Sequence, residues 1–326
     1  MYTGTMKKVG IISILSAIML VVMSLVTSMT VQADNNDSEE QVIDEKWGMP
    51  VYVYGSALTE KEAKSLAEDM GYDFDNLETY IVDAEDLNEF LDDANSSDSS
   101  MYSSVIIERK EEGYGIEVEI PNSDRITRIN KTQYENAMTT SGVTDAKVIV
   151  DSPKPVTGES ALSGIYKAYD EKGEELDKER MELGQDELDV TSDINEDSKD
   201  SEGYDEDELN AAIVDIKQQL SEMDEAATKE DVEEVVNKVL DERGLGNAIS
   251  EDNVNKLVEF ADNYRGSSAI DSDEVKEQLK DISKDVTEKA KDIKDKLDES
   301  GFWEKLGNFF KDLWKAIANF FNSIFE

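Results

Sequence analysis

The chain contains no cysteine and no histidine among its 326 residues. Without cysteine it forms no disulfide bond, no thiolate nucleophile and no cysteine metal site. Without histidine it has no Ser-His-Asp triad, no histidine-containing zinc site and no side chain that usually shuttles protons near neutral pH. Any catalysis would therefore depend on carboxylates, lysine, tyrosine or a bound metal.

Basic side chains are scarce relative to acidic ones. The chain has 33 Lys and Arg residues against 77 Asp and Glu residues, which gives a formal net charge of −44 at pH 7. Such a chain is repelled by the phosphate backbone, so we expect no nucleic-acid partner. The simplest role of the excess carboxylates is to keep the surface solvated.

The N-terminal segment has the pattern of a secretory signal. A short basic start precedes an apolar run over residues 9–29, and small residues stand where a signal peptidase reads the chain. We predict a signal peptide over residues 1–33, cleaved between Ala33 and Asp34. The alternative is an uncleaved anchor, because the run is long enough to span a bilayer. Export without cysteine favours a secreted, cell-surface-associated protein of a Gram-positive envelope.

Residues 34–46 are acidic and we expect them to be disordered, whereas residues 47–171 have the pattern of a folded domain. The element order β-α-β-α-β-β-α-β-α indicates an α+β domain with one mixed sheet and helices against one face. Thr59 and Glu62 form a capping box for the first helix. A Gly-containing turn separates the third and fourth strands, which we expect to form a hairpin. The predicted strands are 51–54, 79–82, 103–111, 114–120 and 146–150, and the predicted helices are 59–70, 84–93, 131–141 and 158–171.

Acidic residues dominate residues 172–208, which we predict to be a connecting stretch. Apolar residues in its first half indicate packing, and its second half, residues 193–207, reads as a solvated linker. A calcium-loop pattern begins at Asp193 but fails, because Ser198 stands where glycine is needed and Tyr204 where a bidentate Glu is needed. We therefore predict no metal and no cofactor. The apolar residues of the first half are Leu176, Met181, Leu183 and Leu188.

Residues 209–299 have helical periodicity and are predicted to form an all-α domain of four helices. Thr228 and Ser250 are expected N-caps of the second and third helices, and Gly244 ends the second. The fourth helix, residues 272–299, carries a narrow apolar seam suited to a bundle or coiled-coil contact.

The last part of the chain, residues 302–325, predicts an amphipathic helix with many aromatic side chains. Six of the nine Phe and two of the three Trp residues lie there, all on one side of a helical wheel. We predict that this side contacts a membrane surface, with three lysines near the lipid headgroups. The predicted membrane-contact residues are Phe302, Trp303, Leu306, Phe309, Phe310, Leu313, Trp314, Ile317, Phe320, Phe321, Ile324 and Phe325, and the predicted headgroup residues are Lys305, Lys311 and Lys315.

Two other partners could cover the aromatic face. It could pack on the protein's own helices, or it could associate with a second copy or with the groove of another envelope component. The segment cannot span a bilayer, because Glu304, Lys311 and Asp312 interrupt it.

The segment GVTDAKVIVDSPKPVTGESALSGIYKAY, residues 142–169, is distinctive, and VYGSALT at residues 53–59 accompanies it. Both resemble the secreted Gram-positive family catalogued as domain of unknown function 1002, the YpuA-like family. The resemblance covers about residues 47–265. It implies export and a cell-envelope setting, and it transfers no reaction and no catalytic residues.

The same segment has a physical interpretation of its own. Thr157 is placed to cap the helix that follows, and the amides near Gly158 and Ser160 could hold an anion at its N-terminus. Glu159 would repel an anion there. We therefore favour a strand-to-helix corner in which small residues such as Gly164 allow close packing.

Taken together, these patterns predict an α+β protein: a mixed-sheet domain with helices, then an all-α domain and a C-terminal amphipathic helix. We expect a secreted, non-catalytic cell-envelope protein whose partner is the membrane surface. The alternative is a carboxylate-dependent hydrolase of envelope polymers, which would need a cleft holding two carboxylates at a fixed short separation and at least one perturbed pKa.

Overall fold

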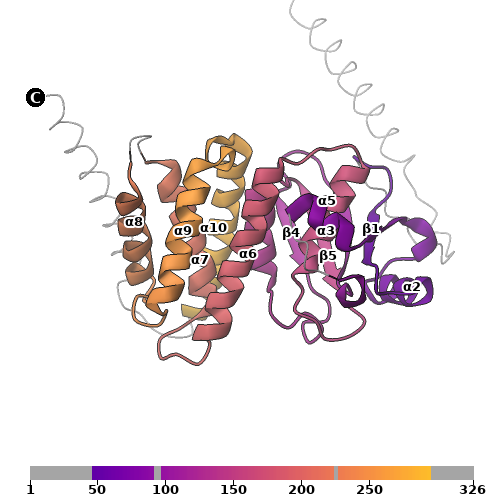
Figure 1. The fold of residues 1–326 in the computed structure, drawn as a ribbon, viewed down its shortest axis with the longest axis horizontal. Helices are drawn as coiled ribbons and strands as arrows, with labels where there is room; N and C mark the ends of the chain where they lie inside the picture. Colours follow the sequence, from indigo (N-terminus) through magenta and orange to yellow (C-terminus); the bar gives the residue numbers. More distant parts are fainter. Residues whose placement is uncertain (1–45, 92–96, 224–226, 295–326) are drawn as a thin grey trace, which may run out of the picture. The chain divides into compact units, whose positions relative to one another are not determined.

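A computed structural model describes residues 46–91, 97–223 and 227–294, with side chains up to residue 283 (Figure 1). Three sets of predictions fall outside these residues. They are the signal peptide with its cleavage site at Ala33 and Asp34, the acidic leader up to residue 45, and the aromatic segment 302–325. The four helices predicted from residue 209 onward begin within the described part.

Five strands form one mixed sheet in the order β2-β1-β3-β5-β4. β1 runs parallel to β2 and antiparallel to β3, while β5 runs antiparallel to β3 and parallel to β4. The predicted mixed sheet and the predicted order of elements are therefore confirmed. The strands are β1 (Val51–Gly55), β2 (Glu78–Val82), β3 (Ser104–Arg109), β4 (Ile116–Glu119) and β5 (Ala146–Asp151).

The predicted hairpin of β3 and β4 is wrong, because β5 lies between them. Asp145, directly before β5, accepts hydrogen bonds from the amides of Gly113 and Gly115 at 2.9 and 3.0 Å. The β3–β4 loop therefore crosses the start of β5 instead of closing a hairpin. The physical reason lies in burial. Every residue of β5 except Lys147 is buried, whereas in β4 the apolar residues alternate with the exposed Glu117 and the half-buried Glu119, a pattern that suits an edge strand.

Helices cover both faces of the sheet, so the prediction of helices against one face is also wrong. In β1, Val51 and Val53 point to the face covered by α5 (Ser160–Glu171), while Tyr52 and Tyr54 point to the face covered by α2 (Glu60–Asp69). The Tyr52 hydroxyl donates to the Ala63 carbonyl oxygen of α2 at 3.1 Å. Figure 1 shows α2 and α6 on opposite sides of the strands. Both sides of this strand are buried because valine and tyrosine alternate over its first four residues, so each side presents apolar or aromatic side chains.

The capping box and the small-residue corner are confirmed. Thr59 caps α2, with Glu62 closing the reciprocal hydrogen bond. On α5, a Cβ at Gly164 would lie 3.2 Å from a Val105 methyl group, so the absence of a side chain lets the helix approach the sheet closely. Two more helices complete this part, α3 (Ala84–Leu91) and α4 (Lys131–Ser141).

A long helix, α6 (Lys178–Ser198), replaces the first part of the expected linker over residues 193–207. Its apolar side is buried against α4 and α9, as the predicted packing of Met181, Leu183 and Leu188 requires. Buried Ile194 extends that side beyond the expected end of packing. The acidic residues made residues 193–198 look like a linker. In the structure they lie on the outer side of the helix, where Asp193 and Glu196 form ion pairs with Arg128.

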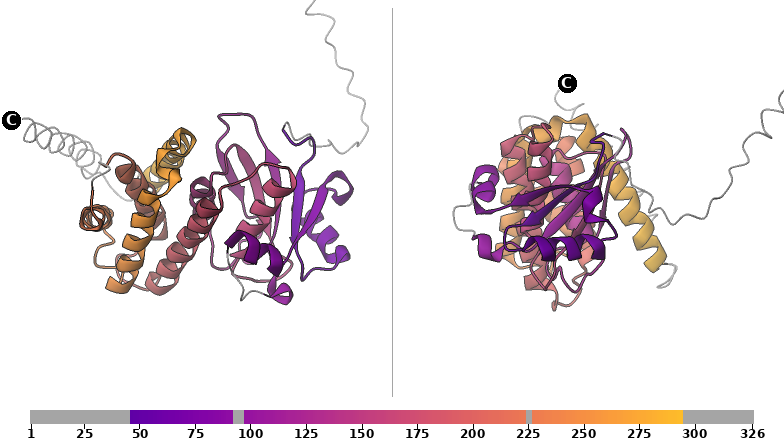
Figure 2. Two further views of the ribbon diagram at one scale, coloured as in Figure 1. Left: turned by 45° about the horizontal axis from the view of Figure 1, so that its top comes forward. Right: turned by 90° about the vertical axis from the view of Figure 1, so that its right-hand side faces the viewer.

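The helices that follow confirm the predicted helical region. They are α7 (Glu206–Ser221), α8 (Lys229–Glu242), α9 (Glu251–Gly266) and α10 (Asp273–Lys294). Thr228 and Ser250 are the N-caps of α8 and α9, as predicted. The start of α10 buries Val275 and Leu279 against α7, and Figure 2 shows these helices on one side of the sheet. In the described part of the chain, no helix combines the length and the hydrophobicity needed to cross a bilayer.

Candidate functional site

The corner between β5 and α5 is built differently from the prediction. Thr157 does not cap α5; its hydroxyl donates instead to Glu159 Oε2 at 3.3 Å. Glu159 is the N-cap residue, has helical backbone angles and forms no side-chain cap bond. Gly158 has a φ of +104°, and its carbonyl oxygen accepts a hydrogen bond from the buried Tyr134 hydroxyl at 2.6 Å. The corner is therefore held by glycine geometry and by Tyr134.

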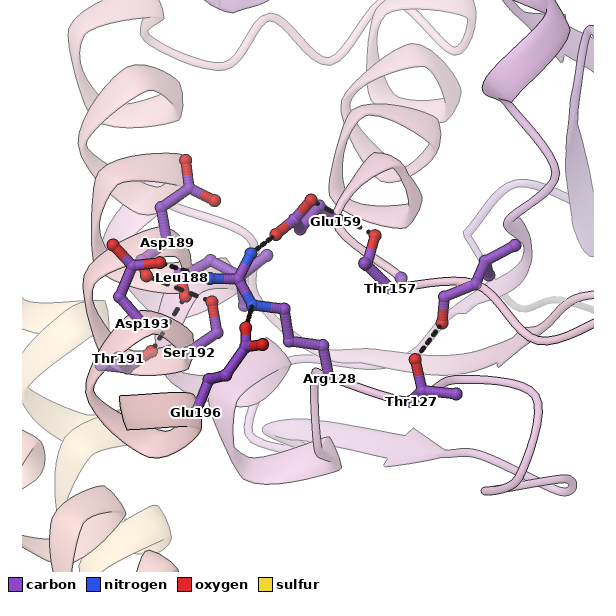
Figure 3. A network of polar contacts seen from close by, with 12 residues as sticks. Thr127, Arg128, Thr157, Glu159, Leu188, Asp189, Thr191, Ser192, Asp193 and Glu196 are labelled. Carbon is purple, nitrogen blue, oxygen red and sulfur yellow. Dashed lines mark hydrogen bonds and ion pairs between the residues drawn. The ribbon is translucent and has the colours of Figure 1, made fainter. Parts of the chain in front are cut away.

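Arg128 ties this corner to α6 (Figure 3). Its guanidinium forms ion pairs with Glu159 at the start of α5 and with Asp193 of α6, and a third with Glu196 at 3.3 Å. Burial acts to lower the pKa of Arg128, but the charges of Glu159 and Asp193 outweigh it and hold the pKa above its usual value. Asp193 also binds Lys256 of α9 at 2.9 Å, so one carboxylate joins three elements.

A cavity of about 470 Å³ opens beside this corner. Its volume lies within the range of roughly 300–1,000 Å³ that is usual for small-molecule sites. The first two turns of α5, the middle of α6, the end of α3 and the segment before β3 form its walls. The lining residues are Leu87, Leu91, Ser100, Met101, Thr157, Glu159, Ser160, Ser163, Gln185 and Asp189.

Asp189 is the most perturbed acid in the cavity wall. The residue is exposed and forms part of the cavity wall. Desolvation of the carboxyl by the surrounding protein raises the pKa of Asp189 from 3.8 to about 6; the hydrogen bond from Gln185 lowers it, and the nearby charge of Glu159 raises it. The Gln185 side-chain amide donates that hydrogen bond to Asp189 Oδ1 at 2.9 Å.

Two further polar atoms of the cavity wall are buried without a hydrogen-bond partner among the described residues. They are Oγ of Ser163, whose side chain is 1% exposed, and Oε1 of Gln185. A buried polar atom without a partner costs about 1–3 kcal/mol, so native proteins usually satisfy it with protein, water or ligand. The two atoms come from facing helices, α5 and α6, at the same cavity.

A second polar cluster lies where α4, α6 and α7 meet. The Lys217 ammonium and the Glu187 carboxylate form an ion pair at 2.5 Å, with both side chains at most 1% exposed. Lys217 also donates to the Asn136 carbonyl oxygen at 3.1 Å, and Thr140 donates to Glu187. Burial lowers the pKa of Lys217, and the charge of Glu187 opposes that shift. This cluster joins three helices and is fully enclosed, which suits a structural role.

The predicted site residues are distributed as follows. All twelve membrane-contact residues and the three headgroup lysines, Lys305, Lys311 and Lys315, lie outside the described residues. The segment considered for anion binding lines the cavity through Thr157, Glu159 and Ser160. Among the described residues, no group of three or more acidic side chains is arranged to hold a metal ion.

Sequence reasoning missed Asp189, Gln185 and the pair of Lys217 and Glu187. The spacing did indicate that Lys217 is buried, because it lies four residues after Ile213 and three before Leu220, inside the apolar stripe of α7. For Asp189 there was no such signal, because a single acid in a very acidic segment looks like any other.

These features define a mixed-sheet α+β protein with a ligand-sized cavity at the start of α5. The chain belongs to the family described as "Protein of unknown function (DUF1002)", whose model matches residues 54–282. It is similar to "Uncharacterized protein YpuA" of Bacillus subtilis (strain 168), with 28% identity over 272 residues that cover 81% of this chain and 86% of that protein. The resemblance expected from the sequence is thereby confirmed. No solved structure matches the chain.

Proposed function

We propose that the protein is an exported, non-catalytic component of the cell envelope, and that residues 302–325 bind the membrane surface as an amphipathic helix. The observation that carries this proposal is the sequence pattern, in which all rings and large aliphatic side chains share one helical face. Such a face inserts about 5–10 Å into the headgroup region, with Trp at its margins. Lys305, Lys311 and Lys315 leave the segment near neutral, which reduces its repulsion from anionic lipid.

The described part of the protein supports a partner outside its own helices. Its exposed large hydrophobic side chains are Ile81 and Tyr114, at 48% and 46% exposure, and both belong to the sheet region. The apolar sides of α7, α8 and α9 are filled by one another, and the start of α10 packs on α7. Among the helical residues whose side chains the structure describes, up to residue 283, there is therefore no large exposed apolar side chain against which the aromatic face could pack.

Tryptophan fluorescence tests the proposal directly. In a Trp47→Phe background, Trp303 and Trp314 are the only fluorescent indoles of the chain. On addition of phosphatidylglycerol vesicles we expect a blue shift of their emission and co-sedimentation of the protein. Phe309→Ser with Phe320→Ser should abolish both, whereas the matched polar-face change Asn319→Ala with Asn322→Ala should leave both intact.

Two results would contradict membrane binding. One is an unchanged emission spectrum with vesicles present. The other is a blue shift that grows with protein concentration in the absence of lipid, which would identify self-association through residues 302–325 instead.

One observation favours the hydrolase as a second candidate, because the cavity holds two carboxylates, Glu159 and Asp189, one of them with a raised pKa. A glycosidase uses two carboxyl groups, one of them an acid with a raised pKa, at a separation of roughly 5–10 Å. Release of reducing sugar from purified cell-wall glycan, lost in both Asp189→Asn and Glu159→Gln, would support this candidate. Turnover that both variants retain would remove it.

A further inference from the structure

We propose that the cavity beside the start of α5 is a binding site for a small primary alkylamine, whose ammonium group binds Asp189 and Gln185. The site is independent of residues 302–325 and of membrane binding. It rests on the cavity, on the polar atoms in its wall that lack partners, and on the charge of the residues that line it.

The acceptors that an ammonium needs lie together on α6. Gln185 and Asp189 are one helical turn apart and are already linked by a hydrogen bond of 2.9 Å. That bond uses the Gln185 amide nitrogen and leaves its Oε1 atom, buried, without a partner among the described residues. An ammonium carries three donors and no acceptor. It can therefore bond to the carboxylate of Asp189 in the cavity wall, and also to Gln185 Oε1 once rotation of the Gln185 side chain brings this buried atom to the cavity surface.

The charge of the wall selects a cation over an anion. Two carboxylates line the cavity, Glu159 and Asp189, and no lysine or arginine does. Glu159 is neutralised by Arg128, whose guanidinium is itself held by three carboxylates. Asp189 has no ion-pair partner among the described residues, and the charges that act on its pKa are those of Glu159, Arg128 and Asp186. The helix N-terminus of α5 is thus shielded from anions, while a cation would compensate the charge of Asp189.

The remaining walls suit an aliphatic chain with a polar end. Leu87 and Leu91 of α3 and Met101 before β3 present apolar surface to the cavity. Across from α6, the buried Ser163 hydroxyl lacks a partner among the described residues, and a rotation about χ1 would let it bond to a second amine or a hydroxyl of the ligand. A chain of a few methylene groups between two polar ends matches this arrangement of apolar and polar walls.

Isothermal titration and NMR of the protein with 1,5-diaminopentane test the proposal. We expect saturable binding of one equivalent, with amide shifts centred on Gln185, Asp189 and Ser163. Asp189→Asn keeps the shape and removes the charge, and we expect it to weaken binding about ten-fold or more, because the charge-assisted bond is lost. The matched control Glu182→Gln removes an acid of the same helix that neither lines the cavity nor acts on the pKa of Asp189, and should leave the affinity unchanged.

The pH dependence and a neutral probe provide the remaining controls. With the pKa of Asp189 at about 6, lowering the pH from 7 to 5 should weaken binding about ten-fold in the wild type and little in Asp189→Asn. The uncharged analogue 1,5-pentanediol should not bind measurably. Equal affinities of wild type and Asp189→Asn, equal binding of diamine and diol, or binding of inorganic phosphate at the same residues would each overturn the proposal.

Discussion

Lys217 of α7 and Glu187 of α6 form an ion pair in the interior of the protein, 2.5 Å apart and at most 1% exposed. The pair lies against α4, which supplies a carbonyl oxygen to Lys217 and a hydroxyl to Glu187. The pair therefore links α4, which packs beside the sheet, to α6 and α7. A buried pair of this kind contributes little net stability compared with apolar residues, but it strongly penalises any arrangement in which one partner is missing.

Lys217→Met should destabilise the protein by about 3–5 kcal/mol, because the charge of Glu187 is left buried without compensation. The double variant Lys217→Met with Glu187→Leu should recover most of that loss. Urea denaturation measures both free energies of unfolding. Lys131→Met, at an exposed lysine of α4, is the control and should change stability by no more than about 0.5 kcal/mol. A double variant no more stable than Lys217→Met would contradict the uncompensated-charge explanation.

Gly184→Ala on α6 should destabilise the protein, although alanine is the better helix former. A Cβ at this position would overlap Ser141 Oγ and lie 2.7 Å from the Ala137 carbonyl oxygen, so α4 and α6 would have to separate. We expect a loss of about 1–3 kcal/mol in thermal or urea unfolding. Gly266→Ala, at the end of α9 with no atom within 4 Å, should instead stabilise by up to about 1 kcal/mol. The same sign for both variants would show that close packing at Gly184 does not limit the α4–α6 contact.

The secondary structure could be predicted well because its causes are local. Alternating residues in β1, the capping box at Thr59 and the N-caps Thr228 and Ser250 each involve residues within a few positions of one another. The C-terminal turn of α6 could not be predicted from local patterns, because its carboxylates bind side chains from distant segments. Asp193, for example, binds Arg128 and Lys256, which lie 65 and 63 residues away.

The strand order and the cavity depend on contacts between distant segments. β3 and β4 follow one another in the chain, yet each pairs with β5, because β5 is covered on both faces and lies inside the sheet, while β4 takes the edge. The cavity likewise brings together α3, α5 and α6. Glu159 indicated from the sequence alone that an anion would be repelled at this corner. That Asp189 lies at the same cavity and adds a second carboxylate there follows only from the three-dimensional structure.

Asp189→Asn should stabilise the protein at neutral pH but not at acid pH. The pKa of Asp189 is raised from 3.8 to about 6, so the folded state binds the proton more tightly than the unfolded chain does. Ionisation of this carboxyl therefore destabilises the folded state progressively as the pH rises from about 4 to about 6. Above that range the loss of stability has its full value. Because the carboxyl is partly exposed, we expect a gain on the order of 1 kcal/mol for the variant at pH 7.5 and almost none at pH 4.

Denaturant unfolding of both proteins at several pH values measures this difference. Other carboxylates titrate in the same range, but they are common to both proteins and cancel. A stability difference that stays constant between pH 4 and pH 7.5 would show that the Asp189 carboxyl is not perturbed in the folded state.

Association with anionic vesicles should strengthen as the pH falls from 7 to 4.5. The net charge of −44 at pH 7 opposes approach to anionic lipid, and at pH 4.5 carboxylates with ordinary pKa values near 4 are only partly ionised. Co-sedimentation with phosphatidylglycerol vesicles measures the bound fraction, after correction for protein that sediments alone as its charge decreases. Deletion of residues 301–326 should abolish binding at both pH values, since the charge only modulates contact made by the aromatic face. A bound fraction that is flat across this range would exclude electrostatic repulsion as the control, and equal binding of the deletion variant would place the contact elsewhere on the protein.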